Sequence, residues 1–460
     1  MADYQLIIIG AGLSGLAAGI RAARFGLKVL IVEQHWQPGG LNSFYFRQGH
    51  LLETGLHAMT NYAPPEEKRA PLNRLFRQLR LSRRSFRTHE QICSEIVFPD
   101  RTLRFSNDPD LLTEDISREF PGAADGFRRL LDMVRDYDPF APAPWRSARR
   151  FLDGVLPDGR LADMLLLPLM VYGNSEEEDM DLGQFVIMFR ALFLEGLFRP
   201  AETIKEFLDM LVDHYTAFGG EIRFRAGVKR ILRRGDRVDG VVLHNGERIT
   251  AGSVLSTAGI PATADLADWD IDRSAYRGKM SFMETIYLLP LRRGASIRND
   301  RTIIFFNHGE HFAYRCPGEA LETSWGVICF PGNFKGLPGT DPFQVRVTNA
   351  ANYEVWKAAA PGEYEMMKER WRERSADQVG KIIGNFRQDV VYVDSFTPMT
   401  IERFTAKAGG AVYGSPVKLK DGRTHCANLF IAGTDQGYLG IVGAMLSGVT
   451  IINRHLLRQE

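Results

Sequence analysis

The stretch that most constrains this chain of 460 residues is LIIIGAGLSGLAAGIRAARFGLKVLIVEQH, at residues 6–35. It reads as a short apolar strand, a glycine turn, an alanine-rich helix, and a second apolar strand that closes on an acid. That order predicts a βαβ unit that holds a dinucleotide at the glycine turn.

Each glycine of the turn has a physical task. Gly10 permits the tight turn, Gly12 lets the backbone approach a pyrophosphate, and Gly15 lets the helix press on the sheet. The free N–H groups at the start of the helix attract the phosphates. Glu33 ends the second strand, where a carboxylate can accept hydrogen bonds from a ribose diol. Both FAD and NAD bind to such a unit.

Three further stretches favour FAD. A second glycine turn, Pro-Gly-Gly at 38–40, could approach the same cofactor, and Glu-Thr-Gly follows at 53–55. Residues 428–457 near the C-terminus read as strand, turn and long apolar helix. There the Asp435 carboxylate suits a ribityl hydroxyl, and the N–H groups of Ile441 and Val442 would face the flavin N1/C2=O edge. The alternative is a helix that only caps a sheet.

With these motifs in family order, the chain resembles the FAD-dependent phytoene desaturase, carotenoid isomerase and retinol saturase group, within the amine-oxidase-like flavoproteins. The matching pieces are GAGLSGLAAG, EQHWQPGG, ETGLHAM, LPLMVYGN, the stretch 218–259, TPMTIERFTAKAGGAVYGSP and AGTDQGYLGIVGAMLSGV. The chain departs from the family in three places. Leu41-Asn42 stand where an arginine is frequent, Glu53 replaces an aspartate, and 200–208 lacks a glycine pair.

The resemblance implies an α/β fold: a discontinuous Rossmann-type FAD-binding domain with an inserted mixed sheet and helical substrate domain. We expect the FAD domain at 1–65, 205–265 and 405–460, and the substrate domain at 66–204 and 266–404. The resemblance also puts backbone groups of Val228 against the adenine and Ala258 near the phosphates, although each could be an ordinary strand or loop residue. The residues expected at the cofactor are Gly10, Gly12, Leu13, Ser14, Gly15, Glu33, Gln34, Gly40, Leu41, Asn42, Thr54, Gly55, Val228, Ala258, Gly433, Asp435, Gly440, Ile441 and Val442.

His57 is the first candidate for a catalytic role, because it follows ETGL, where the family's chain passes close to the flavin. It could donate a proton or polarise a substrate; the alternative is a histidine bonded to cofactor or backbone. Tyr413 and Tyr438 lie in the motifs nearest the ring and could wall the site, or they could simply pack.

The activity implied is that of an FAD-dependent oxidoreductase on C–C or C=C bonds of an apolar polyene, isoprenoid or related lipid. Desaturation, saturation and isomerisation stay open. Two alternatives are an amine-oxidase-like flavoenzyme acting on a small amine, and a non-catalytic flavin-binding protein in a lipid pathway. A second dinucleotide fingerprint for NADPH is missing, so the electron partner would be oxygen, a quinone or a carrier protein.

The bulk composition excludes several other classes. The net charge of +1 gives no sign of nucleic-acid binding, and four scattered cysteines without C-x-x-C predict no metal site. No apolar run reaches about 20 residues, since Arg190 and Glu195 interrupt the stretch 183–199. We expect a cytoplasmic protein. The basic amphipathic stretch 71–87 leaves peripheral membrane contact open, the alternative being a helix packed on its own core.

Overall fold

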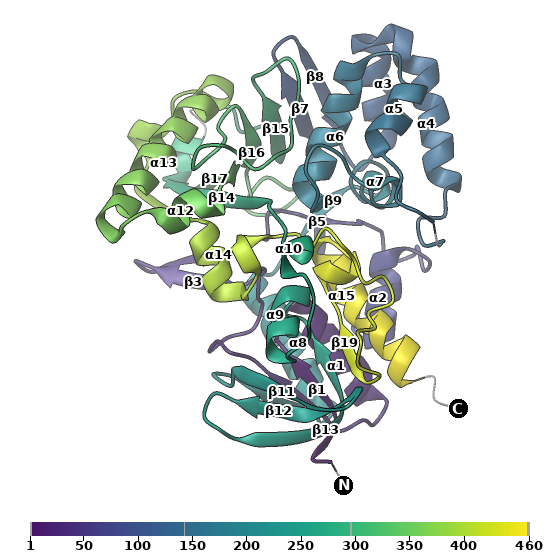
Figure 1. The fold of residues 1–460 in the computed structure, drawn as a ribbon. Helices are drawn as coiled ribbons and strands as arrows, with labels where there is room; N and C mark the ends of the chain where they lie inside the picture. Colours follow the sequence, from purple (N-terminus) through teal and green to yellow (C-terminus); the bar gives the residue numbers. More distant parts are fainter. Residues whose placement is uncertain (1, 142, 295–296, 458–460) are drawn as a thin grey trace.

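The computed structural model describes residues 2–141, 143–294 and 297–457, and two seven-stranded sheets organise them (Figure 1). The first sheet contains the predicted βαβ unit. Its strands in spatial order are β10 (Glu221–Arg223), β2 (Val29–Val32), β1 (Tyr4–Ile9), β13 (Arg248–Ser256), β12 (Arg237–Leu243) and β11 (Val228–Arg234), with β19 (Leu429–Ile431) also paired to β13. Strands β10, β2, β1, β13 and β19 are parallel, whereas β11, β12 and β13 form an antiparallel meander.

Helices that belong to distant parts of the chain pack together on this first sheet. They are α1 (Leu13–Arg24), α2 (Pro71–Leu79), α8 (Ile204–Ala217) and α15 (Gly440–Ile451), which share one apolar core; α9 (Ile260–Leu266) and α10 (Arg273–Tyr276) follow β13. A Cβ atom added to Gly448 of α15 would lie 2.1 Å from the backbone oxygen of Ser14 in α1. The absence of a side chain at residue 448 therefore allows α1 and α15 to cross in close contact.

The second sheet is mixed and forms the upper left of Figure 1. Its strands in spatial order are β18 (Tyr392–Phe396), β14 (Ser281–Leu289), β17 (Phe343–Ala351), β16 (Trp325–Cys329), β15 (Ile303–Asn307), β7 (Ser94–Phe98) and β8 (Arg101–Phe105). Beside it lie α11 (Leu291–Gly294), α12 (Tyr353–Ala358), α13 (Pro361–Ile383) and α14 (Pro398–Thr405). The sequence predicts a helix over 358–383, and α13 confirms it from Pro361 onward.

A helical cluster completes the upper half of the molecule (Figure 1). It contains α3 (Pro109–Glu119), α4 (Ala124–Asp136), α5 (Ala148–Val155), α6 (Gly159–Gly173), α7 (Leu182–Phe189) and the π-helix η2 (Arg190–Leu194). Two small sheets complete the described strands. One pairs β3 (Phe44–Arg47) with β4 (His50–Glu53), and the other places β9 (Leu197–Pro200) between β5 (Met59–Thr60) and β6 (Thr88–Glu90). The short 3₁₀ and π turns are η1 (Pro121–Ala123), η3 (Arg387–Asp389), η4 (Ala408–Gly410), η5 (Thr434–Gln436) and η6 (Ile452–Leu456).

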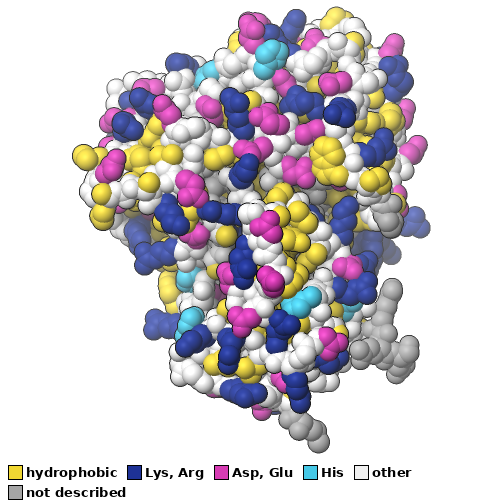
Figure 2. Space-filling view, viewed as in Figure 1, with side chains coloured by type: hydrophobic (Ala, Val, Ile, Leu, Met, Phe, Trp, Pro, Cys, Tyr) yellow, Lys and Arg dark blue, Asp and Glu magenta, His cyan; other side chains and the backbone are white. Residues whose placement is uncertain are grey.

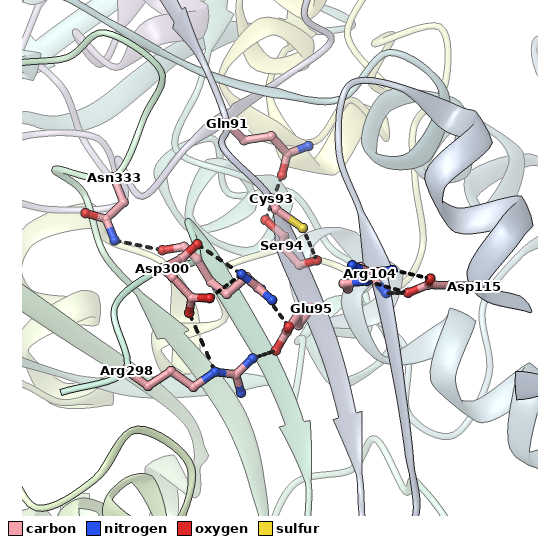
Figure 3. Close-up of polar contacts among 10 residues, drawn as sticks. Gln91, Cys93, Ser94, Glu95, Arg104, Asp115, Arg298, Asp300 and Asn333 are labelled. Atoms are coloured by element: carbon pink, nitrogen blue, oxygen red, sulfur yellow. Dashed lines mark hydrogen bonds and ion pairs between the residues drawn. The ribbon is translucent and has the colours of Figure 1, made fainter. Parts of the chain in front are cut away.

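Arginines pair with buried carboxylates in and beside the second sheet. Figure 3 shows Glu95 of β7 reached by Arg298, and Arg104 of β8 paired with Asp115 of α3. Glu95 also accepts from Arg301 Nε at 2.6 Å. Because an unpaired buried charge is costly, these contacts let the polar groups lie inside the layer.

The apolar face of the basic helix α2 is turned toward the protein. Leu72, Leu75, Phe76 and Leu79 are buried in the core shared with α1 and α15. This agrees with a helix packed on its own core and leaves that face unavailable to a bilayer. Among residues 2–141, 143–294 and 297–457, no helix is both long and apolar enough to cross a membrane.

Candidate functional site: two uncapped helix ends beside a glycine turn

The first glycine turn has the backbone geometry that its sequence predicts. Gly10 has φ +101°, and a Cβ on Gly15 would lie 2.0 Å from the Gly10 carbonyl oxygen. A Cβ on Gly12, by contrast, would meet only the Gly39 carbonyl oxygen, at 4.0 Å. Two of the glycines are therefore required by turn and packing, whereas Gly12 leaves open space beside the backbone, as a phosphate cradle needs.

The second glycine turn lies against the first. Gly39 donates its N–H to the carbonyl of Ala11 at 2.9 Å and forms a bridge with Gly12. Glu-Thr-Gly at 53–55 packs behind it, since Thr54 Oγ1 donates to the Leu41 carbonyl at 3.0 Å. The structure thus brings the three N-terminal motifs, including Leu41, Asn42, Thr54 and Gly55, to one place.

Glu33 is held at the end of β2, beside the first turn. Its side chain is buried and accepts hydrogen bonds from Ala11 N at 2.7 Å and His35 N at 2.9 Å. The chain just before Val228 returns to this point, because Ala226 N donates to the Glu33 carbonyl at 2.8 Å. Gln34 is exposed next to it. This group of residues has the composition expected around an adenosine.

The helices α1 and α15 both begin without a side-chain cap. The residue before α1 is Gly12 and the residue before α15 is Leu439, and neither first turn contains an acid. Ser14 Oγ donates to the Ala444 carbonyl at 2.7 Å, so this hydroxyl joins α1 to α15. Free N–H groups and the helix dipoles make both amino ends suited to anionic groups.

Asp435 lies in the turn before α15, as the sequence predicts, but its carboxylate already has partners. It accepts from Ile260 N at 2.6 Å and from Ser415 N at 2.9 Å. Burial alone would raise the pKa of Asp435, but the charges of Lys407 and Lys418 lower it. The carboxylate therefore holds the segments after β13 and before β19 close to the turn that precedes α15. Its remaining lone pairs could accept a hydrogen bond from a ribityl hydroxyl.

Ala258 and Gly433 lie close to these groups. Ala258 follows Thr257, whose Oγ1 would lie 2.4 Å from a Cβ on Gly10. Gly433 donates its N–H to Ser447 Oγ at 2.6 Å, and a Cβ on it would lie 3.3 Å from Ser14 Oγ. Both residues are thus next to the first glycine turn.

Sequence reasoning missed two lysines in this region. Lys407 is buried and donates to Thr434 Oγ1 at 2.6 Å. Lys418 donates to the Tyr413 carbonyl at 2.9 Å, and burial lowers its pKa to about 8. Lys407 stands within the motif TAKAGG, so a cation before a glycine pair was the available signal.

His57 takes part in a buried charge network that the sequence does not reveal. Its Nε2 lies 2.8 Å from Glu284 Oε2 on β14, and Glu284 also pairs with Arg346 on β17. Burial opposes ionisation, yet the charges of Arg346 and His57 lower the pKa of Glu284 to about 2. Glu284 thus stays ionised at neutral pH and orients the His57 ring, while the described residues give Nδ1 no hydrogen-bond partner.

The two candidate tyrosines make different contacts. Tyr413 donates its hydroxyl to the Val171 carbonyl and meets Phe282 edge-on at 6.2 Å. Tyr438 stacks on Phe140, with ring centroids 6.2 Å apart. Tyr413 therefore borders the apolar core between α6 and β14, whereas Tyr438 lies nearer the surface. No cluster that could hold a metal ion is found among the residues the structure describes.

These observations fit FAD. An open glycine cradle, a buried acid at the end of β2 and an uncapped α1 suit the adenosine and pyrophosphate. The uncapped amino end of α15 suits the electron-rich edge of a flavin. When bound, FAD would supply the redox chemistry, and the chain's residues would hold and orient it.

Comparison with known proteins agrees with this geometry. Residues 13–280 match the model of a family described as flavin containing amine oxidoreductase. The chain is 36% identical to a prolycopene isomerase of Daucus carota, over 90% of this chain and 72% of that protein. It is 22% identical to an all-trans-retinol 13,14-reductase of Danio rerio, over 99% of this chain and 87% of that protein.

Solved structures support the fold alone. An oxidoreductase from Methanosarcina mazei superimposes with a TM-score of 0.67 at 14% identity, over 98% of this chain and 100% of that one. A putrescine oxidase superimposes with a TM-score of 0.64 at 16% identity, over 99% of both chains. The predicted α/β fold and family resemblance are confirmed. The chain belongs to the flavin containing amine oxidoreductase family, and it is an FAD-dependent oxidoreductase.

Proposed function

We propose that the protein acts on C–C or C=C bonds of an apolar polyene or isoprenoid substrate. The observation that carries this proposal is the similarity, over nearly the whole chain, to proteins named for retinol reduction and prolycopene isomerisation. The surroundings of His57 support it, because the adjoining core is built mainly of aliphatic and aromatic side chains from α6, α7 and β14–β17. A long hydrocarbon needs such walls and few polar groups.

We assign the following roles to the parts of the chain. Residues 1–65, 205–265 and 405–460 would hold FAD through the residues expected above, and 66–204 and 266–404 would enclose the substrate. The boundary after residue 65 puts α2 in the substrate domain, although α2 packs on α1 and α15 of the FAD domain. His57 would deliver or accept a proton at Nδ1, with Glu284 fixing the ring through Nε2.

The substrate would reach the site from a membrane surface. Phe140 and Trp145 are 67% and 53% exposed, and Phe140 stacks on Tyr438 just before α15. Figure 2 shows hydrophobic side chains gathered in the middle of the face that it draws, among interspersed charges of both signs. Aromatic side chains at a surface suit the interface between headgroups and acyl chains. Peripheral contact would thus use this aromatic surface, not α2.

The experiment is anaerobic incubation of the FAD-loaded protein with a panel of polyenes and isoprenoid alcohols, followed by flavin absorbance and product chromatography. Bleaching by substrate indicates desaturation, and reoxidation of pre-reduced protein indicates saturation. A changed isomer without net redox indicates isomerisation. Oxygen, a quinone or a carrier is then supplied in turn as electron acceptor. Peroxide formation with small amines, and no reaction with any polyene, would contradict the proposal.

We predict that His57→Ala lowers kcat by about 10²–10⁴-fold, because a positioned proton-transfer group contributes that much. FAD content should stay at the wild-type level. His50→Ala, in the nearby β3–β4 hairpin, is the matched control and should keep full turnover. Steady-state rates on the substrate found above measure the effect, and unchanged turnover in His57→Ala would remove the histidine from the mechanism.

A further inference from the structure

A carboxyl group outside the Glu284 network lies near the amino end of α15. Glu195 follows the π-helix η2, where the predicted apolar run 183–199 stops being helical. Its Oε2 accepts a hydrogen bond from Asn61 Nδ2 at 2.7 Å. Asn61 has φ +67°, an uncommon conformation for a residue other than glycine, and its N–H donates to the Ala191 carbonyl at 3.2 Å.

Two hydrogen bonds lead from Glu195 through Asn61 to Thr60, and Thr60 lies beside the start of α15. Thr60 Oγ1 donates to Asn61 Oδ1 at 3.0 Å, and Asn61 donates in turn to Glu195. A Cβ on Gly440, the first residue of α15, would lie 3.4 Å from Thr60 Oγ1. Only Thr60 and Asn61 therefore separate the Glu195 carboxyl from the helix end that suits the flavin.

No cation neutralises Glu195 among the described residues, in contrast to Glu95, which two arginines reach (Figure 3). Arg190 is the cation that faces it, but this guanidinium donates to the backbone carbonyls of Val134 and Tyr137. Glu67 faces it with a like charge. Burial raises the pKa of Glu195 to about 7, against the lowering effects of the Asn61 hydrogen bond and the Arg190 charge. Such a carboxyl changes charge near neutral pH.

We propose that Glu195 is the redox-linked proton acceptor of the flavin site. Glu195 takes up one proton from water when negative charge arrives at the amino end of α15, and it returns that proton when the charge leaves. The charge comes with the two electrons of a hydride taken from substrate, or from a reducing dye in the test. By thermodynamic linkage, protonation of Glu195 must in turn raise the midpoint potential of the bound flavin. The inference needs bound FAD but no polyene substrate, so it stands or falls separately from the proposed activity.

The test is the midpoint potential of the bound flavin, measured with equilibrating dyes between pH 5.5 and 8.5 without substrate. Glu195→Gln keeps a neutral side chain at every pH. Its potential should match the wild type at the acid end, where Glu195 is protonated. It should rise above the wild type as pH increases through about 7, where only the wild type gains a carboxylate. Glu66→Gln removes an exposed carboxylate whose charge is not among those acting on Glu195, and it should follow the wild-type curve.

Parallel curves for wild type and Glu195→Gln across the whole pH range would overturn the proposal. If Glu195→Gln does not fold, Asn61→Gly replaces it, because glycine adopts φ +67° without strain. Loss of the Asn61 hydrogen bond raises the pKa of Glu195. The pH at which the slope of midpoint potential against pH changes, the bend in the curve, should therefore move to a higher value. A bend that stays at the wild-type pH would equally contradict the assignment.

Discussion

Gly15→Ala protein is expected to be purified almost free of flavin. The added methyl carbon would lie 2.0 Å from the Gly10 carbonyl oxygen and 3.3 Å from Ile8 Cγ2. Backbone cannot yield as a flexible side chain can, so α1 must move away from β1. That movement separates the amino end of α1 from the glycine turn, and the pyrophosphate loses N–H donors from both.

Flavin released from denatured Gly15→Ala protein, measured per chain, should fall at least about tenfold below the wild type, a loss of about 1.4 kcal/mol or more in binding free energy. Gly154→Ala is the matched control, since Gly154 lies in α5 and a Cβ there meets no atom within 4 Å. That variant should keep its FAD. Full FAD content in Gly15→Ala would show that α1 does not approach the cofactor.

Arg346→Met should lower the free energy of unfolding by about 3–5 kcal/mol, because it leaves Glu284 buried without its cation. Arg346 is fully buried and also donates to the Glu53 carbonyl at 2.8 Å and the Leu56 carbonyl at 3.3 Å. It therefore joins β17 to the loop that carries His57. Because Glu284 titrates near pH 2 in the folded protein against 4.5 ordinarily, its contribution is present above about pH 4.5 and is lost toward pH 2.

Chemical denaturation of the FAD-loaded variants measures this effect. Arg160→Met is the control, since its partner Asp100 is exposed and surface pairs contribute about 0–1 kcal/mol. The double variant Arg346→Met/Glu284→Leu should recover part of the loss, because it removes the stranded charge as well. A cost for Arg346→Met no larger than that for Arg160→Met would show that the buried network does not hold the loop that carries His57 to β14 and β17.

The βαβ unit could be predicted because its signals are local. Residues 5–33 contain the strand, turn, helix and acid in order, and glycine at 10 and 15 is required by the backbone itself. The turn at Asn245-Gly246 is equally local, and Gly246 has φ +89° between β12 and β13. The final helix was predictable from its apolar run after a glycine turn.

The His57 network could not be predicted, because it depends on strand register. Glu284 pairs across β14 and β17 with Thr348, and Ile286 pairs with Arg346, so the two charges are diagonal neighbours on one face. Nothing in the sequence links positions 57, 284 and 346. A charged residue in the middle of a buried strand was the one signal, and it does not name the partner. Glu195 shares this difficulty, since Asn61 reaches it from a distant loop.

The most direct measurement of the central claim is the absorbance spectrum of the purified protein, with chromatography of the cofactor released by denaturation. We expect a yellow protein that carries one FAD per chain, or takes up one FAD per chain when refolded with it. A colourless protein that binds no FAD under either condition would contradict the assignment of an FAD site at the amino ends of α1 and α15.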